Sequence, residues 1–153
     1  MEELPYGISG FYNSDESKPP EMDVNKYKKL CIEFARKLGG ELLEFTDSLY
    51  PANFHKARFT LPTKDICLVM NKHYPLLAFA NTVEEMKIRF IDYPEESKAV
   101  PEEYSVLTAE TLEARVPENF AELPGNKMNK GEIEKVNYWK PETIGQIVFN
   151  FWD

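Results

Sequence analysis

The region between residues 41 and 93 constrains the fold most strongly, because it holds a series of strand-like segments joined by short links. Five segments have the composition of β-strands: ELLEFT, HKARFTL, ICLVM, LLAFAN and MKIRFIDY. Turn-forming sequences such as PTKD and NKHYP separate them. Parallel neighbours need a crossover of about a dozen residues or more. The links therefore predict a meander of antiparallel strands.

The side-chain patterns of these segments predict how the strands are buried. In the second segment the alternating pattern places Ala57, Phe59 and Leu61 on the inward face. In the fifth segment it places Met86, Ile88 and Phe90 on the inward face. The third segment, residues 66–70, is a continuous apolar run, which is typical of a strand covered on both faces. These patterns predict strands that belong to one twisted sheet.

Residues 23–38 have the periodicity of an amphipathic helix. Apolar residues recur three and four positions apart and form one stripe: Val24, Tyr27, Leu30, Cys31, Phe34, Ala35 and Leu38. Asp23 is a suitable N-cap, and Gly39 can adopt the left-handed conformation that often ends a helix. We therefore expect a long helix that packs on one face of the sheet.

Downstream of residue 93 the sequence predicts short elements. TAETLEARV predicts a helix near residues 109–116 with Thr108 as its N-cap, and PENFAEL could add one turn. The weak alternation of EIEKVNYW, residues 132–139, predicts a last strand at the edge of the sheet. Thr143 and Gln146 match a capping box, which predicts a helix over residues 144–152. The β-propensity of this tail leaves a strand as the alternative.

Together these elements predict an α+β domain. It would have a single antiparallel sheet of about five to six strands, one long N-terminal helix on one face, and short helices near residues 109–116 and 144–152. Residues 1–22 are rich in turn formers and are expected to be a loosely structured lead-in to a single domain over residues 23–153. A chain of 153 residues is long enough to bury a stable core.

The ends of the chain and its cysteines bear on its location. MEELPYGISG lacks the basic and apolar regions of a signal peptide, and no apolar run in the sequence is long enough to span a membrane. We therefore expect a cytoplasmic protein without membrane contact. Cys31 and Cys67 lie in apolar patterns, so we expect buried free thiols rather than a disulfide or a metal pair.

The net charge of −8 is unevenly distributed. Residues 92–122 contain two bases and nine acids, which are Asp92, Glu95, Glu96, Glu102, Glu103, Glu110, Glu113, Glu118 and Glu122. An acidic field repels nucleic acid and attracts basic partners. On charge alone, we favour the simpler interpretation that the acids keep a small protein soluble. The bases of residues 23–38 are expected to form the solvated face of the helix rather than a nucleic-acid site.

The sequence contains no motif that fixes a reaction. Gly39 and Gly40 follow a helix rather than open one, which excludes a phosphate-binding loop at that position. Ser48, Ser105 and Cys67 lack the flanking residues of an activated nucleophile. We therefore assign no catalytic residue and no cofactor, although distant residues can assemble a site in a folded chain.

Two histidines suggest an alternative function. His55 and His73 flank the same predicted hairpin and could approach each other in space. With nearby carboxylates, such a pair can bind a metal ion. A pair without defined spacing is more often structural, so no metal ligand is assigned, and a small enzyme or ligand-binding protein with a site near these residues remains the alternative.

The C-terminal stretch KPETIGQIVFNFWD contains an apolar–Gly–Gln/Glu–apolar–apolar–Phe–Asn–x–Trp–Asp pattern at residues 144–153. This pattern resembles the C-terminal ends of small acidic bacterial proteins. The overall plan of the chain is similar to that of immunity proteins, which neutralise polymorphic toxins in bacteria. The resemblance implies a cytoplasmic protein that blocks a toxin domain, often a basic nuclease, through acidic and aromatic contacts. It carries over no catalytic residue.

We therefore expect a non-enzymatic, acidic module that binds a basic protein partner. The expected contact residues combine acids of the charged stretch with aromatic residues that a small domain could leave exposed: Glu102, Glu103, Glu110, Glu113, Tyr138, Trp139 and Trp152. A self-assembling structural protein is a further alternative, in which the aromatic tail forms a homodimer interface.

Overall fold

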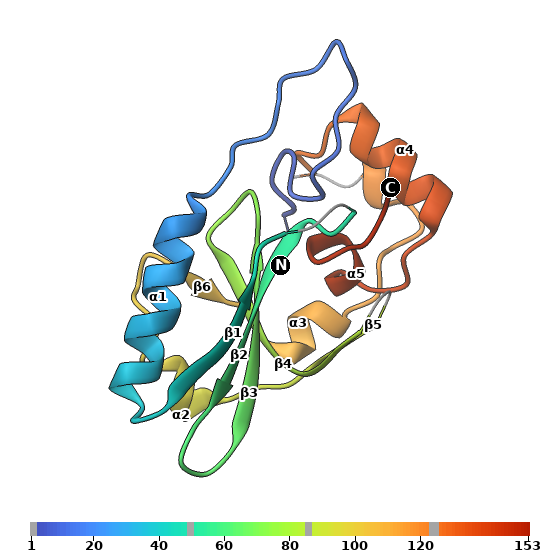
Figure 1. Ribbon diagram of the computed structural model, residues 1–153. Coiled ribbons are helices and arrows are strands. Elements are labelled where there is room, and N and C mark those ends of the chain that lie inside the picture. Colours follow the sequence, from blue (N-terminus) through green and yellow to red (C-terminus); the bar gives the residue numbers. More distant parts are fainter. Residues whose placement is uncertain (1–2, 49–50, 85–86, 123–125) are drawn as a thin grey trace.

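The structure is a computed structural model that describes residues 3–48, 51–84, 87–122 and 126–153. It has the predicted α+β class, with a curled six-stranded sheet and several helices (Figure 1). None of the helices in the described part of the chain is both long and apolar enough to cross a bilayer.

Five strands form the predicted antiparallel meander. They are β1 (Glu41–Thr46), β2 (Phe54–Thr60), β3 (Asp65–Asn71), β4 (Leu76–Glu84) and β5 (Lys87–Phe90), and they lie in the sheet in this order. The inward positions expected in β2 are confirmed, since Ala57 and Phe59 are fully buried. The expectation for Met86 falls outside the described residues. A sixth strand, β6 (Ser105–Val106), pairs in parallel with β4 and was not predicted.

Helix α1 (Val24–Lys37) packs on one face of this sheet. The Asp23 carboxylate caps its first turn by accepting a hydrogen bond from the Asn25 backbone N–H at 2.9 Å. Gly39 follows the helix with a φ of +66°, the left-handed conformation expected for it. The buried stripe of α1 includes Phe34, whose ring lies 5.0 Å from that of Phe59 on β2 and 5.9 Å from that of Phe79 on β4.

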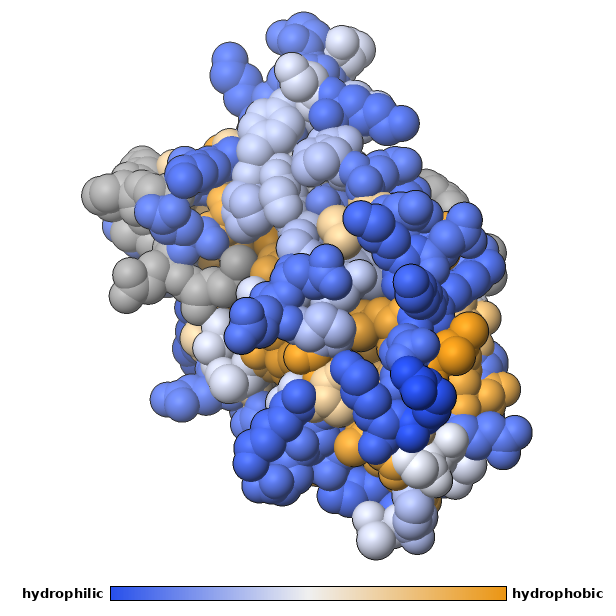
Figure 2. Space-filling model, turned by 90° about the vertical axis from the view of Figure 1, so that its left-hand side faces the viewer, coloured by the Kyte–Doolittle hydropathy of each residue, from blue (hydrophilic) through white to orange (hydrophobic). Residues whose placement is uncertain are grey.

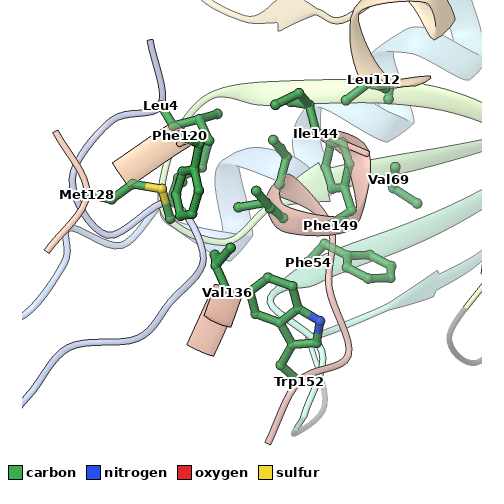
Figure 3. Close-up of a cluster of buried hydrophobic side chains, with 14 residues drawn as sticks. Leu4, Phe54, Val69, Leu112, Phe120, Met128, Val136, Ile144, Phe149 and Trp152 are labelled. Atoms are coloured by element: carbon green, nitrogen blue, oxygen red, sulfur yellow. The ribbon is translucent and has the colours of Figure 1, made fainter. Parts of the chain in front are cut away.

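The opposite face of the sheet is covered by the two ends of the described chain. Successive residues of a strand point to opposite faces. Accordingly, Leu68 belongs to the core beneath α1, whereas its neighbour Val69 belongs to a second core with residues such as Leu4, Val136 and Trp152 (Figure 3). Figure 1 shows α1 on one side of the sheet and the C-terminal elements on the other.

The segment predicted as a last strand, residues 132–139, is instead helical. It belongs to α4 (Lys130–Trp139), so that prediction was wrong. A capping box explains the helix: the Asn129 side chain accepts from the Glu132 N–H at 2.8 Å, and the Glu132 side chain accepts from the Asn129 N–H at 3.1 Å. The weak alternation concealed an apolar pair three residues apart, Ile133 and Val136, that packs inward.

The tail also differs from the prediction. The helix α5 covers only Gly145–Val148, and Phe149 is already extended. The capping box of Thr143 and Gln146 does not form, because the Gln146 Oε1 accepts from the Glu142 N–H at 2.7 Å and Ile144 is the N-cap. The strand alternative is not observed either, since no strand occurs among described residues 107–153.

The remaining elements are short. The predicted helix near residues 109–116 is α3 (Ala109–Glu113), and Thr108 caps it as expected. Two further short elements are α2 (Pro94–Ser97) and the 3-10 turn η1 (Phe120–Glu122). Cys31 is buried, Cys67 is half-buried, and both are free thiols. Burial raises the pKa of the Cys31 thiol to about 12, so the thiol is held in its unreactive neutral form.

The N-terminal segment has no helix or strand over residues 3–22, but it contributes to the core. Leu4 and Ile8 are buried in the second core, where Ile8 is fully covered. The Glu132 carboxylate holds the segment by accepting from the Gly7 N–H at 2.6 Å, the Ser9 N–H at 3.0 Å and the Ser9 hydroxyl at 2.6 Å. Little burial was expected in this segment, and its turn-rich composition conceals these contacts.

Candidate binding groove

A groove of about 420 Å³ lies beside the second core. Residues from β5, α3 and the end of α4 line it, together with much of the tail from Pro141 to Trp152. Five aromatic residues contribute to its wall: Phe90, Trp139, Phe149, Phe151 and Trp152. Ligand pockets commonly have volumes of about 300–1,000 Å³ and apolar linings with a few polar groups, so this groove has the properties of a binding site.

Gly145 allows the groove wall to close. A Cβ atom at this position would lie 2.7 Å from the Phe90 ring and 3.0 Å from the Leu112 backbone oxygen, so any other residue here would force the Phe90 ring or the Leu112 backbone to move. Phe149 then packs between two strands, with its ring centroid 5.8 Å from that of Phe90 and 5.9 Å from that of Phe54. The glycine in the tail pattern therefore brings α5 against β5 and α3.

Trp139 has a buried hydrogen-bond donor without an acceptor among the described residues. Its indole Nε1 is shielded from solvent and has no hydrogen-bond partner in the part of the chain that the structure describes. Lys140 follows it in the left-handed conformation, with a φ of +50°, and ends α4. On the outside, the ring of Tyr138 packs edge-on against Trp139 with centroids 5.4 Å apart, and Tyr138 is 75% exposed.

The groove brings together three of the seven predicted contact residues, namely Glu113, Trp139 and Trp152. Tyr138 joins them through its contact with Trp139, and Glu110 lies one helical turn before Glu113 on α3. Trp152 was expected to be exposed, and this was wrong, because only 5% of it is accessible. Its ring lies 6.4 Å from that of Phe11, and the Trp152 backbone N–H donates to Asn150 Oδ1 at 3.2 Å.

Glu102 and Glu103 lie elsewhere, on the side of the molecule that carries α1. Glu103 and Tyr104 line a smaller hollow of about 250 Å³ together with three lysines of α1, which are Lys26, Lys29 and Lys37. Figure 2 shows this side, where hydrophilic side chains surround a band of apolar surface. The acidic stretch thus approaches the basic helix here, so the two charge blocks of the sequence form a mixed surface in the fold.

The four predicted glutamates are nevertheless exposed and have no ion-pair partner in the part of the chain that the structure describes. Glu102, Glu103, Glu110 and Glu113 form no ion pair with any other described residue. In the same stretch, Glu95 pairs with Lys98 at 3.1 Å, and Glu96 pairs with Lys64 at 3.1 Å. The stretch therefore contains both neutralised acids and acids that are available for contact with another molecule.

The two histidines are buried in different surroundings. His55 packs beside Tyr27 and Phe45, and its Nδ1 accepts from the Ser48 N–H at 2.7 Å. The His73 Nδ1 lies 2.7 Å from the Pro20 carbonyl oxygen. Burial lowers the pKa of both side chains. Within the described ranges, no group of three or more histidine, cysteine, aspartate or glutamate side chains could hold a metal ion.

Buried polar side chains stabilise the second core through hydrogen bonds, and these contacts were not predicted from the sequence. The Asn53 and Asn71 amides each donate to the Ile8 and Val148 carbonyls at 2.8–3.1 Å. The Asn150 amide donates to the carbonyls of Ser9 and Ile147 at 3.1 and 2.9 Å. Burial raises the pKa of Glu132, and its hydrogen bonds oppose this rise. Only the Asn129–Glu132 capping spacing signalled any of this in the sequence.

The chain matches no protein-family model, no curated protein and no solved structure.

Proposed function

We propose that this protein is a non-enzymatic binding module for a basic protein partner in the cytoplasm, of the kind formed by toxin-neutralising immunity proteins. One observation carries the proposal: Glu102, Glu103, Glu110 and Glu113 are exposed, and none forms an ion pair with another described residue. Keeping acids exposed and unpaired favours rapid, salt-sensitive association with a basic surface.

Exposed aromatic surface beside the groove that Glu113 lines supports the proposal. Tyr138 is among the most exposed large apolar residues of the described chain, and Trp139 beneath it lines the same groove as Glu113. Tyrosine and tryptophan are enriched among residues that dominate binding energy at interfaces. In this proposal the partner contacts Glu110, Glu113 and Tyr138 together. Trp152 supports the groove from within rather than touching the partner.

Charge reversal tests this proposal. Replacing Glu102, Glu103, Glu110 and Glu113 with lysine should weaken binding to a partner purified from the source cells by at least about tenfold and flatten its salt dependence. The matched control reverses four exposed acids outside the stretch, which are Asp15, Glu41, Asp65 and Glu134. The control has the same net charge, so equal weakening by both quadruple variants would reject a local acidic surface.

A further inference from the structure

We propose that the groove beside Trp139 binds a small carboxylate with an aromatic or branched apolar body. This inference goes beyond the proposed function and does not depend on it. It follows from the shape of the groove, from the chemistry of its uncommitted polar groups and from Lys87, the one lysine among the described residues that line it. Each of these points to a different part of the ligand.

The wall of the groove selects an apolar body. Phe90, Phe149 and Phe151 contribute aromatic rings, and Ile88 and Leu112 contribute aliphatic surface. Aromatic ligands gain from edge-to-face and offset contacts with such rings in addition to burying area. The volume of about 420 Å³ has room for one ring and a short chain rather than for a folded peptide.

Two of the uncommitted polar groups of the lining are hydrogen-bond donors. The Trp139 Nε1–H has no acceptor among described residues. The Gln146 Oε1 is already occupied by the Glu142 N–H, which leaves the amide N–H groups of Gln146 for a ligand. Asn150, in contrast, is fully engaged with Ser9, Ile147 and Trp152. A groove with spare donors is complementary to a ligand with oxygen acceptors.

Lys87 makes a carboxylate the favoured acceptor. It lines the groove, is exposed, and forms no ion pair within the described residues. The one acid of the lining, Glu113, follows Leu112, which meets Phe90 at Gly145. Lys87 lies three residues before Phe90, roughly 10 Å along an extended strand. Alternation along β5 turns the Lys87 side chain away from Ile88 and Phe90, so this exposed lysine belongs to the rim of the groove. A carboxylate at that rim can pair with its flexible side chain.

The buried donor also explains why the groove would respond to a ligand. A donor without an acceptor loses its hydrogen bonds to water and gains none in return, which destabilises the unliganded state. A ligand oxygen reaches Nε1 only if side chains of the lining shift. Lys87 and Gln146 are exposed and therefore have the freedom to shift. The signal of binding should consequently appear at the Trp139 indole N–H.

The test is a titration followed by ¹H–¹⁵N NMR of the two indole N–H groups, with Trp139→Phe used to assign them. The probes are 3-phenylpropionate, its neutral amide and 3-phenylpropylamine, which share one body and differ in the head group. We expect a saturable shift of the Trp139 signal with millimolar 3-phenylpropionate and at least about tenfold weaker binding of the amide. Absence of a shift, or equal or tighter binding of the amine, would overturn the proposal.

Two variants locate the contacts. Lys87→Met keeps the length of the side chain and removes its charge, so 3-phenylpropionate should bind at least about fivefold more weakly. Lys98→Met removes an exposed charge outside the groove and should bind like the wild type. Binding that is unchanged in Lys87→Met would overturn the assignment. These measurements need no protein partner, so they fail or succeed separately from the charge-reversal experiment.

Discussion

The two faces of the sheet are stabilised by different physical means. The face beneath α1 is an apolar, aromatic core that one amphipathic helix closes, and its contacts join α1 to strands of the meander such as β2 and β4. The other face is closed by segments from the two ends, and buried asparagine and glutamate side chains stabilise it with hydrogen bonds that span up to 141 residues. The first face depends on shape and apolar area, whereas the second depends on satisfied hydrogen bonds.

This difference determines which substitutions each face tolerates. An apolar core accepts changes that conserve volume, because the hydrophobic effect is non-directional. When a substitution leaves a buried polar group without its hydrogen-bond partner, the folded state is destabilised by the full desolvation penalty of that group. The same difference bears on the groove, because its wall is formed from the second face.

The largest expected effect tests the apolar face. Replacing Phe34, which is 1% exposed, with alanine should lower the free energy of unfolding by about 3–5 kcal/mol, because it removes a ring packed against Phe59 and Phe79. Urea unfolding measures the change. Ile32→Ala on the same helix is the control, since Ile32 is 57% exposed and should cost about 0.5 kcal/mol or less. Similar losses in both variants would show that α1 does not close this face.

The next effect tests the polar face. Replacing Glu132 with alanine leaves the N–H groups of Gly7, Ser9 and Asn129 without their acceptor, so we expect a loss of about 3 kcal/mol. Amide hydrogen exchange should accelerate at Gly7 and Ser9 while the amides of α1 stay protected. The exposed Glu134 on the same helix provides the control for replacement with alanine. Uniform acceleration throughout the molecule would contradict a division between the faces.

The smallest effect is a pH dependence. Burial, reinforced by Lys72 and Lys28 and opposed by Asp47, lowers the pKa of His55 from 6.5, so the unfolded chain binds the proton more tightly. The contribution of His55 is therefore complete above pH 6.5 and is lost as the pH falls, by at most about 1.4 kcal/mol per pH unit. His55→Phe should show a shallower slope in urea unfolding between pH 7.5 and 5.5. An unchanged slope would assign the effect to other groups, with His73 the first to examine.

The elements of the first face could be predicted because their signals are local. The stripe of α1, its Asp23 cap and the alternation of β2 each need only a few adjacent residues to be recognised. Residues 132–139 were misassigned because the side chain that decides the structure, Glu132, is polar and fully buried. Its partners Gly7 and Ser9 lie 125 and 123 residues away, and no local pattern indicates that they will meet.

The groove was predictable only in part, because most of its residues meet through contacts between distant parts of the chain. Glu113, Trp139 and Trp152 could be named from charge and aromatic content alone. Lys87 and Phe90 could not, because they reach the groove only when β5 packs against α5, more than fifty residues later in the chain. The burial of Trp152 could not be predicted either, because it depends on tertiary packing against Phe11 from the N-terminal segment.

The long span of the asparagine contacts has a consequence for synthesis of the protein. A ribosome completes α1 and the strand meander before it adds Asn150, so the α1 face can close on a nascent chain. Phe54, Val69 and Ala78 on the other face must wait for residues 144–152 to emerge. Until then the growing chain exposes an apolar face of the completed sheet, and chaperones bind surfaces of this kind. Premature termination of synthesis would leave that face permanently exposed.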